Sequence, residues 1–492
     1  MNVSFVHFGR EHLGLEYLSA HLKNSGHEVK LFCDPGLFSR EDNVFYAPFL
    51  EGAFKKKNIA KQVIESNPGL VCFSAYTTTF PWAKNIARKI KDALKAPIVF
   101  GGMHASLVPE KVLENDFIDY VIVGEGEQAL LELVRGLGRK DSLSRIRNLC
   151  FKEKNKIVRN ALRPPLDNLD ELPLPDKRLF EKYVNFKDDY MIMTSRGCAF
   201  SCSYCCESHF NRIYNGSYFR RRSVANVINE LKLMKTRYHF KEVMFFDSIL
   251  FTDKPWLKEL CSCYRKEINV PFRCTGHINF LDREAGEILK DAGCYCIDFG
   301  VQTFNERIRR SILDRFETNE QIRKALSICD ELKIKYDLDL MFGLPEAKLK
   351  DYLLAVDFVK RSKSLNRLKC YYLSYFPGTP IIEKSKQLGL LDEHDISGIN
   401  EGKIGDWFHV DSVKAAEDKI LSETFTKIYK VYPLIPGFIR GKIAGGRMYR
   451  YFRFMPNFLV IAMQLLIAAK NNDYRFKIYI NNYLTALSKI RR

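Results

Sequence analysis

The chain has 492 residues, of which 46% are hydrophobic and 28% are charged, and its formal net charge is +18. This length exceeds what one core of ordinary size accommodates, so we expect two or three domains, and the composition excludes disordered, collagen-like and low-complexity proteins. Residues 1–9 lack the basic region and the long apolar run of a secretory signal. We therefore expect a cytoplasmic protein whose cysteines are thiols or metal ligands.

Residues 1–150 alternate short apolar runs, such as VSFVHF and PIVFGG, with amphipathic stretches, such as WAKNIARKIKDAL. This rhythm predicts an α/β domain with a doubly wound, Rossmann-like parallel sheet that helices cover on both faces. Ligands of such domains bind at the carboxyl ends of the strands. The predicted strands end in small or polar loops at Gly9 and at residues 74–79, 101–104 and 124–126.

A proline-rich, acidic stretch at residues 164–176, PPLDNLDELPLPD, cannot continue a helix or a central strand. We interpret residues 151–187 as a linker. The alternation of strands and helices resumes over residues 188–385, with about six strands, and predicts a partial (β/α)6 barrel of the TIM type. Chemistry is expected where its strands end.

Residues 386–492 lose this rhythm and are predicted to be mainly helical. Their last part, residues 431–492, is strongly basic, with eleven Lys or Arg against one acid, Asp473. The apolar run FLVIAMQLLIAA is too short to cross a bilayer, which needs about 20 apolar residues. Two interpretations stay open, an internally packed helical cap and a helix at an anionic membrane surface. Nucleic-acid binding is not expected, because no zinc-finger or helix-turn-helix spacing occurs.

Cys198, Cys202 and Cys205 carry the most specific chemical signal. They lie on one short loop after the apolar run YMIMTS, so their thiolates can converge on an iron-sulfur cube and leave its fourth iron without a protein ligand. A structural zinc site is the competing interpretation, with Cys206 or His209 as its further ligand.

This CxxxCxxC loop after the first barrel strand resembles that of radical S-adenosylmethionine (SAM) enzymes. The resemblance implies a [4Fe-4S] metal-binding loop whose open iron holds S-adenosyl-L-methionine and cleaves it to methionine and a 5′-deoxyadenosyl radical. It also places Tyr204 beside the adenine. The later segments 245–248, 299–303, 341–345 and 376–380 resemble the family's other strand ends, and imply SAM contacts from Asp247, Gly300 and Gln302. Many relatives carry Glu where this chain has Gln302.

The strand-end loops of residues 1–150 resemble the cobalamin (B12-binding) domain that precedes the barrel in one branch of this family. The alternative is a purely architectural domain. The Asp-x-His-x-x-Gly signature of other cobalamin enzymes is absent, so the lower axial ligand of the cobalt has no candidate in the sequence. The resemblance implies a cobalamin site lined by Leu13, Gly14, Ser74, Thr77, Thr78, Gly101, Gly102, His104, Gly124, Glu125, Gly126 and Gln128.

The combined resemblance implies a cobalamin-dependent radical enzyme that removes hydrogen from an unactivated carbon, most simply a C-methyltransferase. Cyclisation, ring rearrangement or carbon–carbon bond formation with the same cofactors is an alternative, and a cluster or cobalamin sensor is a non-enzymatic one. No residue is assigned as a general acid or base. The expected partners are a small-molecule or lipid-like substrate, an electron donor such as flavodoxin or ferredoxin, and a peripheral membrane contact through residues 431–492.

Overall fold

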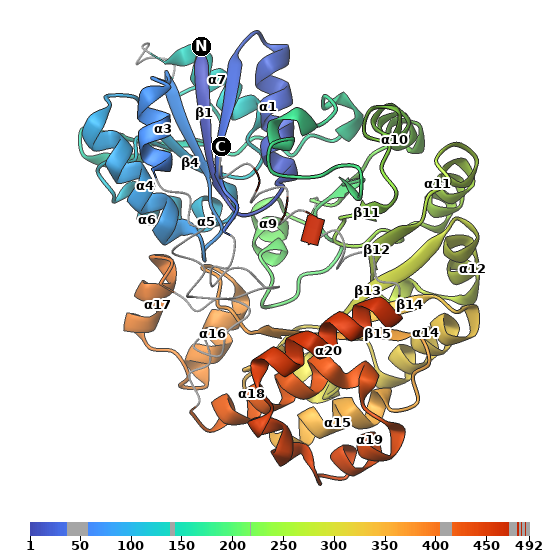
Figure 1. Ribbon diagram of the computed structural model, residues 1–492. Helices are drawn as coiled ribbons and strands as arrows, with labels where there is room; N and C mark the ends of the chain where they lie inside the picture. The colour runs from blue at the N-terminus through green and yellow to red at the C-terminus, as the bar shows by residue number, and fades with distance from the viewer. Residues whose placement is uncertain are drawn as a thin grey trace.

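The computed structural model describes residues 1–36, 58–137, 143–216, 218–403 and 416–471, together with residues 480, 481, 484 and 488. Within these ranges, two sheets of mainly parallel strands follow one another along the chain, each accompanied by helices, and a group of helices comes last (Figure 1). The predicted fold class, a doubly wound domain followed by a six-stranded barrel and a helical C-terminal region, is confirmed.

The first sheet has the strand order β2-β1-β3-β4-β5-β6-β7, in which β1 to β5 run parallel and β6 and β7 are antiparallel additions. Its strands are β1 (Asn2–Phe8), β2 (Glu28–Asp34), β3 (Leu70–Ser74), β4 (Ile98–Gly101), β5 (Tyr120–Ile122), β6 (Leu149–Glu153) and β7 (Lys156–Arg159). The sheet therefore continues to Arg159, beyond the expected domain boundary at residue 150, so its last two strands occupy part of the predicted linker.

Helices cover both faces of this sheet. Neighbouring residues of a strand point to opposite faces, so they contact different helices. Phe5 belongs to one buried cluster with the interior residues of α1 and α7, whereas Val6 belongs to another with those of α3, α4 and α6. The order of the strands reverses between β1 and β3, which is where a ligand crevice is expected. The helices are α1 (Leu13–Asn24), α3 (Ile59–Glu65), α4 (Phe80–Ala93), α5 (Gly102–Leu107), α6 (Pro109–Leu113) and α7 (Glu127–Gly136).

Two short 3-10 helices, η1 (Leu169–Glu171) and η2 (Lys177–Phe180), lie in the segment between the sheets. This segment is fastened to α1 of the first domain. The carboxylate of Asp176 accepts hydrogen bonds from the Ser19 hydroxyl at 2.6 Å and from the Lys23 ammonium at 2.6 Å, and the backbone N–H of Asp176 donates to the carbonyl of Glu16. This part of the linker is therefore fixed to the first domain.

The second sheet has six parallel strands in the order β15-β14-β13-β12-β11-β8. These strands are β8 (Tyr190–Ile192), β11 (Val243–Phe245), β12 (Phe272–Gly276), β13 (Cys294–Gln302), β14 (Lys335–Phe342) and β15 (Leu365–Tyr372). A two-stranded antiparallel pair, β9 (Ser195–Arg196) and β10 (Arg220–Arg221), adjoins its beginning. The predicted partial barrel of six strands is confirmed, and its sheet is open between β8 and β15.

The helices of the barrel start at recognisable capping residues. The Ser223 and Asp253 side chains accept hydrogen bonds from the first turns of α10 and α11, and Thr318 and Gln321 form a capping box at α14, which satisfies backbone N–H groups that the helix leaves unpaired. The helical segments are α9 (Glu207–Ile213), α10 (Val224–Tyr238), α11 (Lys254–Glu267), η3 (Ile278–Phe280), α12 (Arg283–Asp291), α13 (Glu306–Ser311), α14 (Asn319–Leu332) and α15 (Leu349–Val359).

Of the C-terminal helices, α18 packs beside β15, one edge of the barrel sheet, and α19 and α20 lie next to it (Figure 1). Buried Tyr429 and Tyr432 donate hydrogen bonds to the carbonyls of Tyr352 and Val356 in α15, so this region shares the core of the barrel. Within the described ranges, no helix combines the length and apolar character that a membrane span requires. The helices are α16 (Pro380–Gln387), α17 (Glu393–Asn400), α18 (Ala416–Val431), η5 (Tyr432–Leu434), α19 (Gly437–Ala444), η6 (Tyr449–Phe454) and α20 (Asn457–Lys470).

Candidate active site

The loop that carries Cys198, Cys202 and Cys205 leaves β9 through a turn that requires glycine. Gly197 has a φ of +83°, and a Cβ at this position would lie 2.4 Å from the carbonyl oxygen of Tyr218. The Asn211 side chain of α9 donates hydrogen bonds to the carbonyls of Cys198 at 3.1 Å and Phe200 at 3.0 Å. The first half of the loop is therefore fixed by contacts within the protein.

The three thiols lie close enough to affect one another's ionisation. Burial, reinforced by the neighbouring cysteines, raises the pKa of Cys198 to about 11 and that of Cys205 to about 12, and burial also raises the pKa of Cys202. A bound cation removes this penalty, because a coordinating thiol is deprotonated outright. Without a metal the three thiols therefore stay protonated at neutral pH, and a bound cation would release their protons as it takes the sulfurs as ligands.

The competing zinc interpretation lacks support from the neighbouring side chains. Cys206 packs in a small apolar cluster with Leu107 and Phe376, away from a ligand role. Within the described ranges, one group of potential metal ligands has donor atoms that all lie within 4.8 Å of one another, as the ligands of one ion must. This group contains none of the loop cysteines. In the described part of the chain, no three of Cys198, Cys202, Cys205, Cys206 and His209 therefore form a preassembled site for one ion.

An arginine that no sequence motif marks fixes a positive charge beside this loop. The Arg315 guanidinium lies 3.7 Å from Cys202 Sγ and 3.5 Å from the Tyr204 hydroxyl, and it donates to the Gly300 carbonyl at 2.5 Å. Its Nε pairs with the buried Glu317 carboxylate at 2.7 Å. Arg315 thereby connects the cysteine loop with the strand that carries the predicted SAM contacts, Gly300 and Gln302.

His277 completes the surroundings of this arginine. One guanidinium nitrogen of Arg315 lies 3.2 Å from His277 Nε2, and the imidazole stacks on Phe200 of the cysteine loop with ring centroids 4.2 Å apart. Burial, together with the charge of Arg315, lowers the pKa of His277 to about 4. At neutral pH the imidazole is therefore uncharged and accepts from Arg315.

Replacing Arg315 by methionine is expected to lower the reduction potential of the bound cluster by roughly 50–100 mV, because a nearby positive charge favours the more negative, reduced cluster. Redox titration followed by electron paramagnetic resonance measures this shift. Arg315→Lys should recover most of the potential. Since Arg315→Met leaves the Glu317 carboxylate buried without its partner, the double variant Arg315→Met/Glu317→Gln separates the electrostatic effect from misfolding. An unchanged potential in the folded double variant would contradict this role.

The other predicted SAM contacts lie around the same loop. Asp247 is buried, and its Oδ1 accepts hydrogen bonds from the Thr194 backbone and hydroxyl, each at 2.9 Å, and from the Ser195 hydroxyl at 2.5 Å. Its buried Oδ2 has no hydrogen-bond partner among the described residues, so it is an acceptor that a ligand can use. Gln302 has a φ of +66° and folds its amide back toward Gly300, whose missing Cβ makes room for it.

The loops predicted to bind cobalamin lie at the carboxyl ends of β1, β3, β4 and β5. His12 caps α1 by accepting from the Leu15 N–H at 3.2 Å, and its other ring nitrogen lies 3.5 Å from the Ser74 hydroxyl. The exposed ring of Tyr76 lies 5.8 Å from the His12 ring. A Cβ at Gly101 would contact only the Ile122 carbonyl at 3.9 Å, so this edge has open space for a large ligand.

The remaining predicted cobalamin residues have different surroundings. His104 and Thr77 are fully buried and contact each other, with Nδ1 and Oγ1 3.2 Å apart, while Leu13 is also buried. Gly102 and Gly124 have φ values of +83° and +77°, which glycine adopts without strain. Gln128 lies on the exposed face of α7 and donates to Glu132. Gly14, Thr78 and Gly126 are partly exposed at the loops.

Acidic residues of the first domain attach directly to the loop that precedes the cysteines. Glu125 Oε1 lies 2.8 Å from Arg220 and 3.3 Å from Arg196, and Glu127 lies 2.6 Å from Arg196. Although burial opposes it, the hydrogen bond from Arg220 and the charge of Arg196 lower the pKa of Glu125. Since Arg196 is two residues before Cys198, these ion pairs hold the two predicted cofactor sites next to each other.

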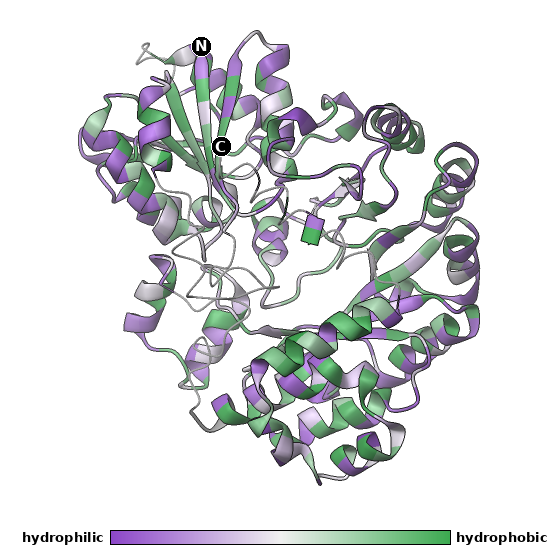
Figure 2. Cartoon of the chain, viewed as in Figure 1, coloured by the Kyte–Doolittle hydropathy of each residue, from purple (hydrophilic) through white to green (hydrophobic). Residues whose placement is uncertain are grey.

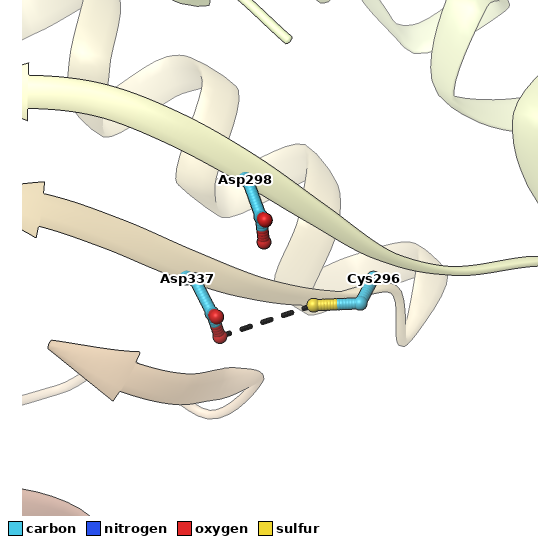
Figure 3. Close-up of side chains that lie close together, drawn as sticks. All are labelled: Cys296, Asp298 and Asp337. Atoms are coloured by element: carbon cyan, nitrogen blue, oxygen red, sulfur yellow. Dashed lines mark hydrogen bonds between the residues drawn. The ribbon is translucent and has the colours of Figure 1, made fainter. Parts of the chain in front are cut away.

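A second buried cluster lies inside the barrel, where Cys296, Asp298 and Asp337 approach one another from β13 and β14 (Figure 3). Their arrangement resembles a metal site, but Lys369 of β15 supplies the neutralising cation. Its ammonium lies 2.9 Å from Asp298, 3.4 Å from Asp337 and 3.6 Å from Asp339. The cluster is therefore an ion-pair network that joins three adjacent strands.

Asp339 is the least favourably placed acid of this network. Burial raises the pKa of its carboxyl to about 6, against the opposing charge of Lys369, and its Oδ1 accepts no hydrogen bond from the described residues. The Asp339 carboxyl loses its proton at a lower pH in the unfolded chain than in the folded protein. The free energy of unfolding therefore falls as pH rises from about 4 to about 6. Asp339→Asn is expected to raise the free energy of unfolding by about 1–2 kcal/mol at pH 8, but not at pH 4.5.

Urea unfolding at several pH values measures this difference, and the exposed Asp92→Asn is the matched control. A pH dependence of stability that is the same in Asp339→Asn as in the wild type would contradict the raised pKa.

Comparison with known proteins adds the family context. Residues 10–134 match the B12 binding domain family, and residues 192–359 match the Radical SAM superfamily. The chain is 27% identical, over 75% of its length and 77% of the relative's, to an uncharacterized methyltransferase of Pyrococcus horikoshii. Its fold is similar to that of the radical SAM methyltransferase TsrM of Kitasatospora setae, at a TM-score of 0.62 and 19% identity, with 78% of this chain and 76% of that chain covered. It is also similar to the cobalamin-dependent SAM radical enzyme OxsB, at a TM-score of 0.66 and 16% identity, with 100% and 80% covered.

Proposed function

Because the chain joins a B12-binding domain to a Radical SAM domain and therefore belongs to the cobalamin-binding radical SAM enzymes, we propose that it methylates an unactivated carbon of a small-molecule substrate. The observation that carries this proposal is the pairing of Glu125 and Glu127 with Arg196 and Arg220. It holds the strand ends of the B12-binding domain against the loop of the three cysteines. A substrate between them faces both cofactor sites.

The chain's own residues bind and position the cofactors. Cys198, Cys202 and Cys205 hold the [4Fe-4S] cluster, while Tyr204, Asp247, Gly300 and Gln302 line the SAM site. The loops at residues 9–14, 74–78, 101–104 and 124–128 hold cobalamin. When bound, the cluster and SAM supply hydrogen abstraction through a 5′-deoxyadenosyl radical, and cobalamin supplies a methyl group.

The methyl outcome is supported by the relatives, since the Pyrococcus horikoshii protein and TsrM are both named methyltransferases. The proposal includes two partners. An electron donor such as flavodoxin or ferredoxin is needed, because the cluster must receive an electron before each cleavage of SAM. Residues 431–492 make the second contact, with a membrane surface. We also assign residues 1–159 and 188–385 as the two catalytic domains and residues 386–492 as a basic C-terminal region.

Metabolic labelling tests the methylation proposal. Cells that produce the chain under anaerobic conditions are fed methionine with a labelled methyl group, and their small molecules are compared with those of cells that produce the Cys198→Ala/Cys202→Ala/Cys205→Ala variant. We expect a product that appears only with the wild type and carries the label on carbon. A wild-type-specific product without label would contradict methylation and favour cyclisation or another carbon–carbon bond-forming reaction.

A further inference from the structure

Helix α20 is apolar along most of its length (Figure 2), and one of its faces is exposed. Val460, Ile467 and Ala468 are buried against the helices that cover the barrel. The opposite face carries Phe458, Leu459, Leu465 and Leu466, whose spacing places them on one side of the helix. Phe458 is 74% exposed and Leu466 is 60% exposed. A soluble helix needs polar residues on its outer face, and this helix has none at these positions.

The 3-10 helix η6, directly before α20, continues this surface and adds positive charge. Tyr451 is 72% exposed and Phe454 is 77% exposed, and the exposed Arg450 and Arg453 alternate with them. The Arg453 guanidinium lies 6.0 Å from the centre of the Phe454 ring. We call the exposed residues Arg450, Tyr451, Arg453, Phe454, Phe458, Leu459, Leu465 and Leu466 the aromatic-basic surface.

The charge of this region indicates which kind of partner can bind the aromatic-basic surface. Residues 432–470 contain six Lys or Arg and no Asp or Glu. An apolar face bordered by arginines and aromatic rings, without acids, matches the boundary between anionic headgroups and acyl chains, where rings are inserted and cations meet phosphates. We propose that the aromatic-basic surface docks onto an anionic lipid bilayer, with α20 lying in the plane of the interface.

This inference deepens the membrane contact of the proposed function by naming its residues and its lipid chemistry. In this proposal the basic region is both an internally packed cap and a membrane contact, the two interpretations that its sequence left open. The buried faces of η6 and α20 pack on α18, which contacts β15, so the region is an internal cap. Its outer face is the docking surface. Binding through it leaves the cysteine loop and the B12-binding domain untouched, so docking and catalysis can be measured separately.

Vesicle co-sedimentation of the full-length holoenzyme tests the docking. We expect the protein to sediment with phosphatidylcholine vesicles that contain ~30 mol % phosphatidylglycerol, and about tenfold less with phosphatidylcholine alone. Phe454→Ser/Phe458→Ser should weaken binding to the anionic vesicles about tenfold or more, and Arg450→Gln/Arg453→Gln should weaken it similarly. All four side chains are exposed, so both variants should keep the wild-type thermal midpoint.

The matched controls are Leu233→Ser, which removes a side chain that is 52% exposed on α10, and Lys258→Gln/Arg265→Gln, which removes two exposed cations of α11. Neither should reduce vesicle binding. The proposal is overturned if the wild type stays in the supernatant or if the controls lose binding as much as the surface variants do. It is also overturned if Phe454→Ser/Phe458→Ser only dissociates a dimer, as measured by analytical ultracentrifugation. Formation of 5′-deoxyadenosine by all variants shows separately that SAM cleavage, on which the proposed function depends, is intact.

Discussion

Replacing any one of Cys198, Cys202 and Cys205 by alanine is expected to reduce the formation of 5′-deoxyadenosine to background, which is a loss of at least about a thousandfold. The reason is the donor set. In the proposed cluster each cysteine would supply one of three thiolates, and Cys206, the further thiol next to the loop, packs with Leu107 and Phe376. Chromatographic measurement of 5′-deoxyadenosine, with iron content determined on the same sample, tests this expectation.

Cys206→Ala is the matched control, because it removes a thiol next to Cys205 without removing a ligand. It should keep its iron and its activity, at a small cost in stability from the lost packing. Loss of iron in Cys206→Ala, together with retention in one of the three ligand variants, would contradict the assignment of the cluster cysteines.

Lys177→Met is expected to lower the free energy of unfolding by about 3–5 kcal/mol, because it leaves two buried carboxylates without their cation. The Lys177 ammonium is 1% exposed and lies 2.5 Å from Glu11 and 2.9 Å from Glu16. It also donates to the carbonyl of Met191 in β8 at 2.8 Å. This one side chain therefore ties the helix α1 of the B12-binding domain to the first strand of the barrel.

Urea unfolding followed by circular dichroism measures the loss, and the exposed Lys182→Met is the control, expected to change stability by less than about 0.5 kcal/mol. Lys177→Met/Glu16→Gln should recover part of the stability by removing one unpaired charge. The pH dependence gives a second readout. Burial already raises the pKa of Glu16, and without Lys177 it rises further, so the defect should shrink as pH falls and Glu16 takes up a proton. A defect that is equal in Lys182→Met, or independent of pH, would refute this role.

The architecture was predictable where the signal is local. Alternating apolar runs and amphipathic stretches identify parallel strands and crossover helices, and both sheets followed from that pattern. The hairpin of β6 and β7 was not predicted. Its two-residue turn is Lys154-Asn155, with φ values of +46° and +62°, and it lacks the glycine that usually marks such turns. Its strands carry polar residues where they face water, so the sequence of this segment resembles that of a linker.

The candidate site also has one part that the sequence predicts and another that it does not. The three cysteines share one loop, so their spacing alone indicates a cluster. Arg315 is 113 residues from Cys202 in sequence, and the ion pairs of Glu125 with Arg196 and Arg220 cross from one domain to the other. Contacts of this kind depend on how two sheets are placed together, which no local pattern encodes. The partnership of His104 with Thr77 is likewise a matter of packing between a strand end and a helix.

The most direct test of the two-cofactor account is anaerobic purification of the full chain with iron, sulfide and cobalamin quantified, alongside the Cys198→Ala/Cys202→Ala/Cys205→Ala variant. We expect about four irons and about one cobalamin per wild-type chain, and a variant that has lost its iron but keeps its cobalamin, since the two sites lie on separate sheets. Zinc in place of iron, or a wild-type chain that binds iron but no cobalamin, would contradict it.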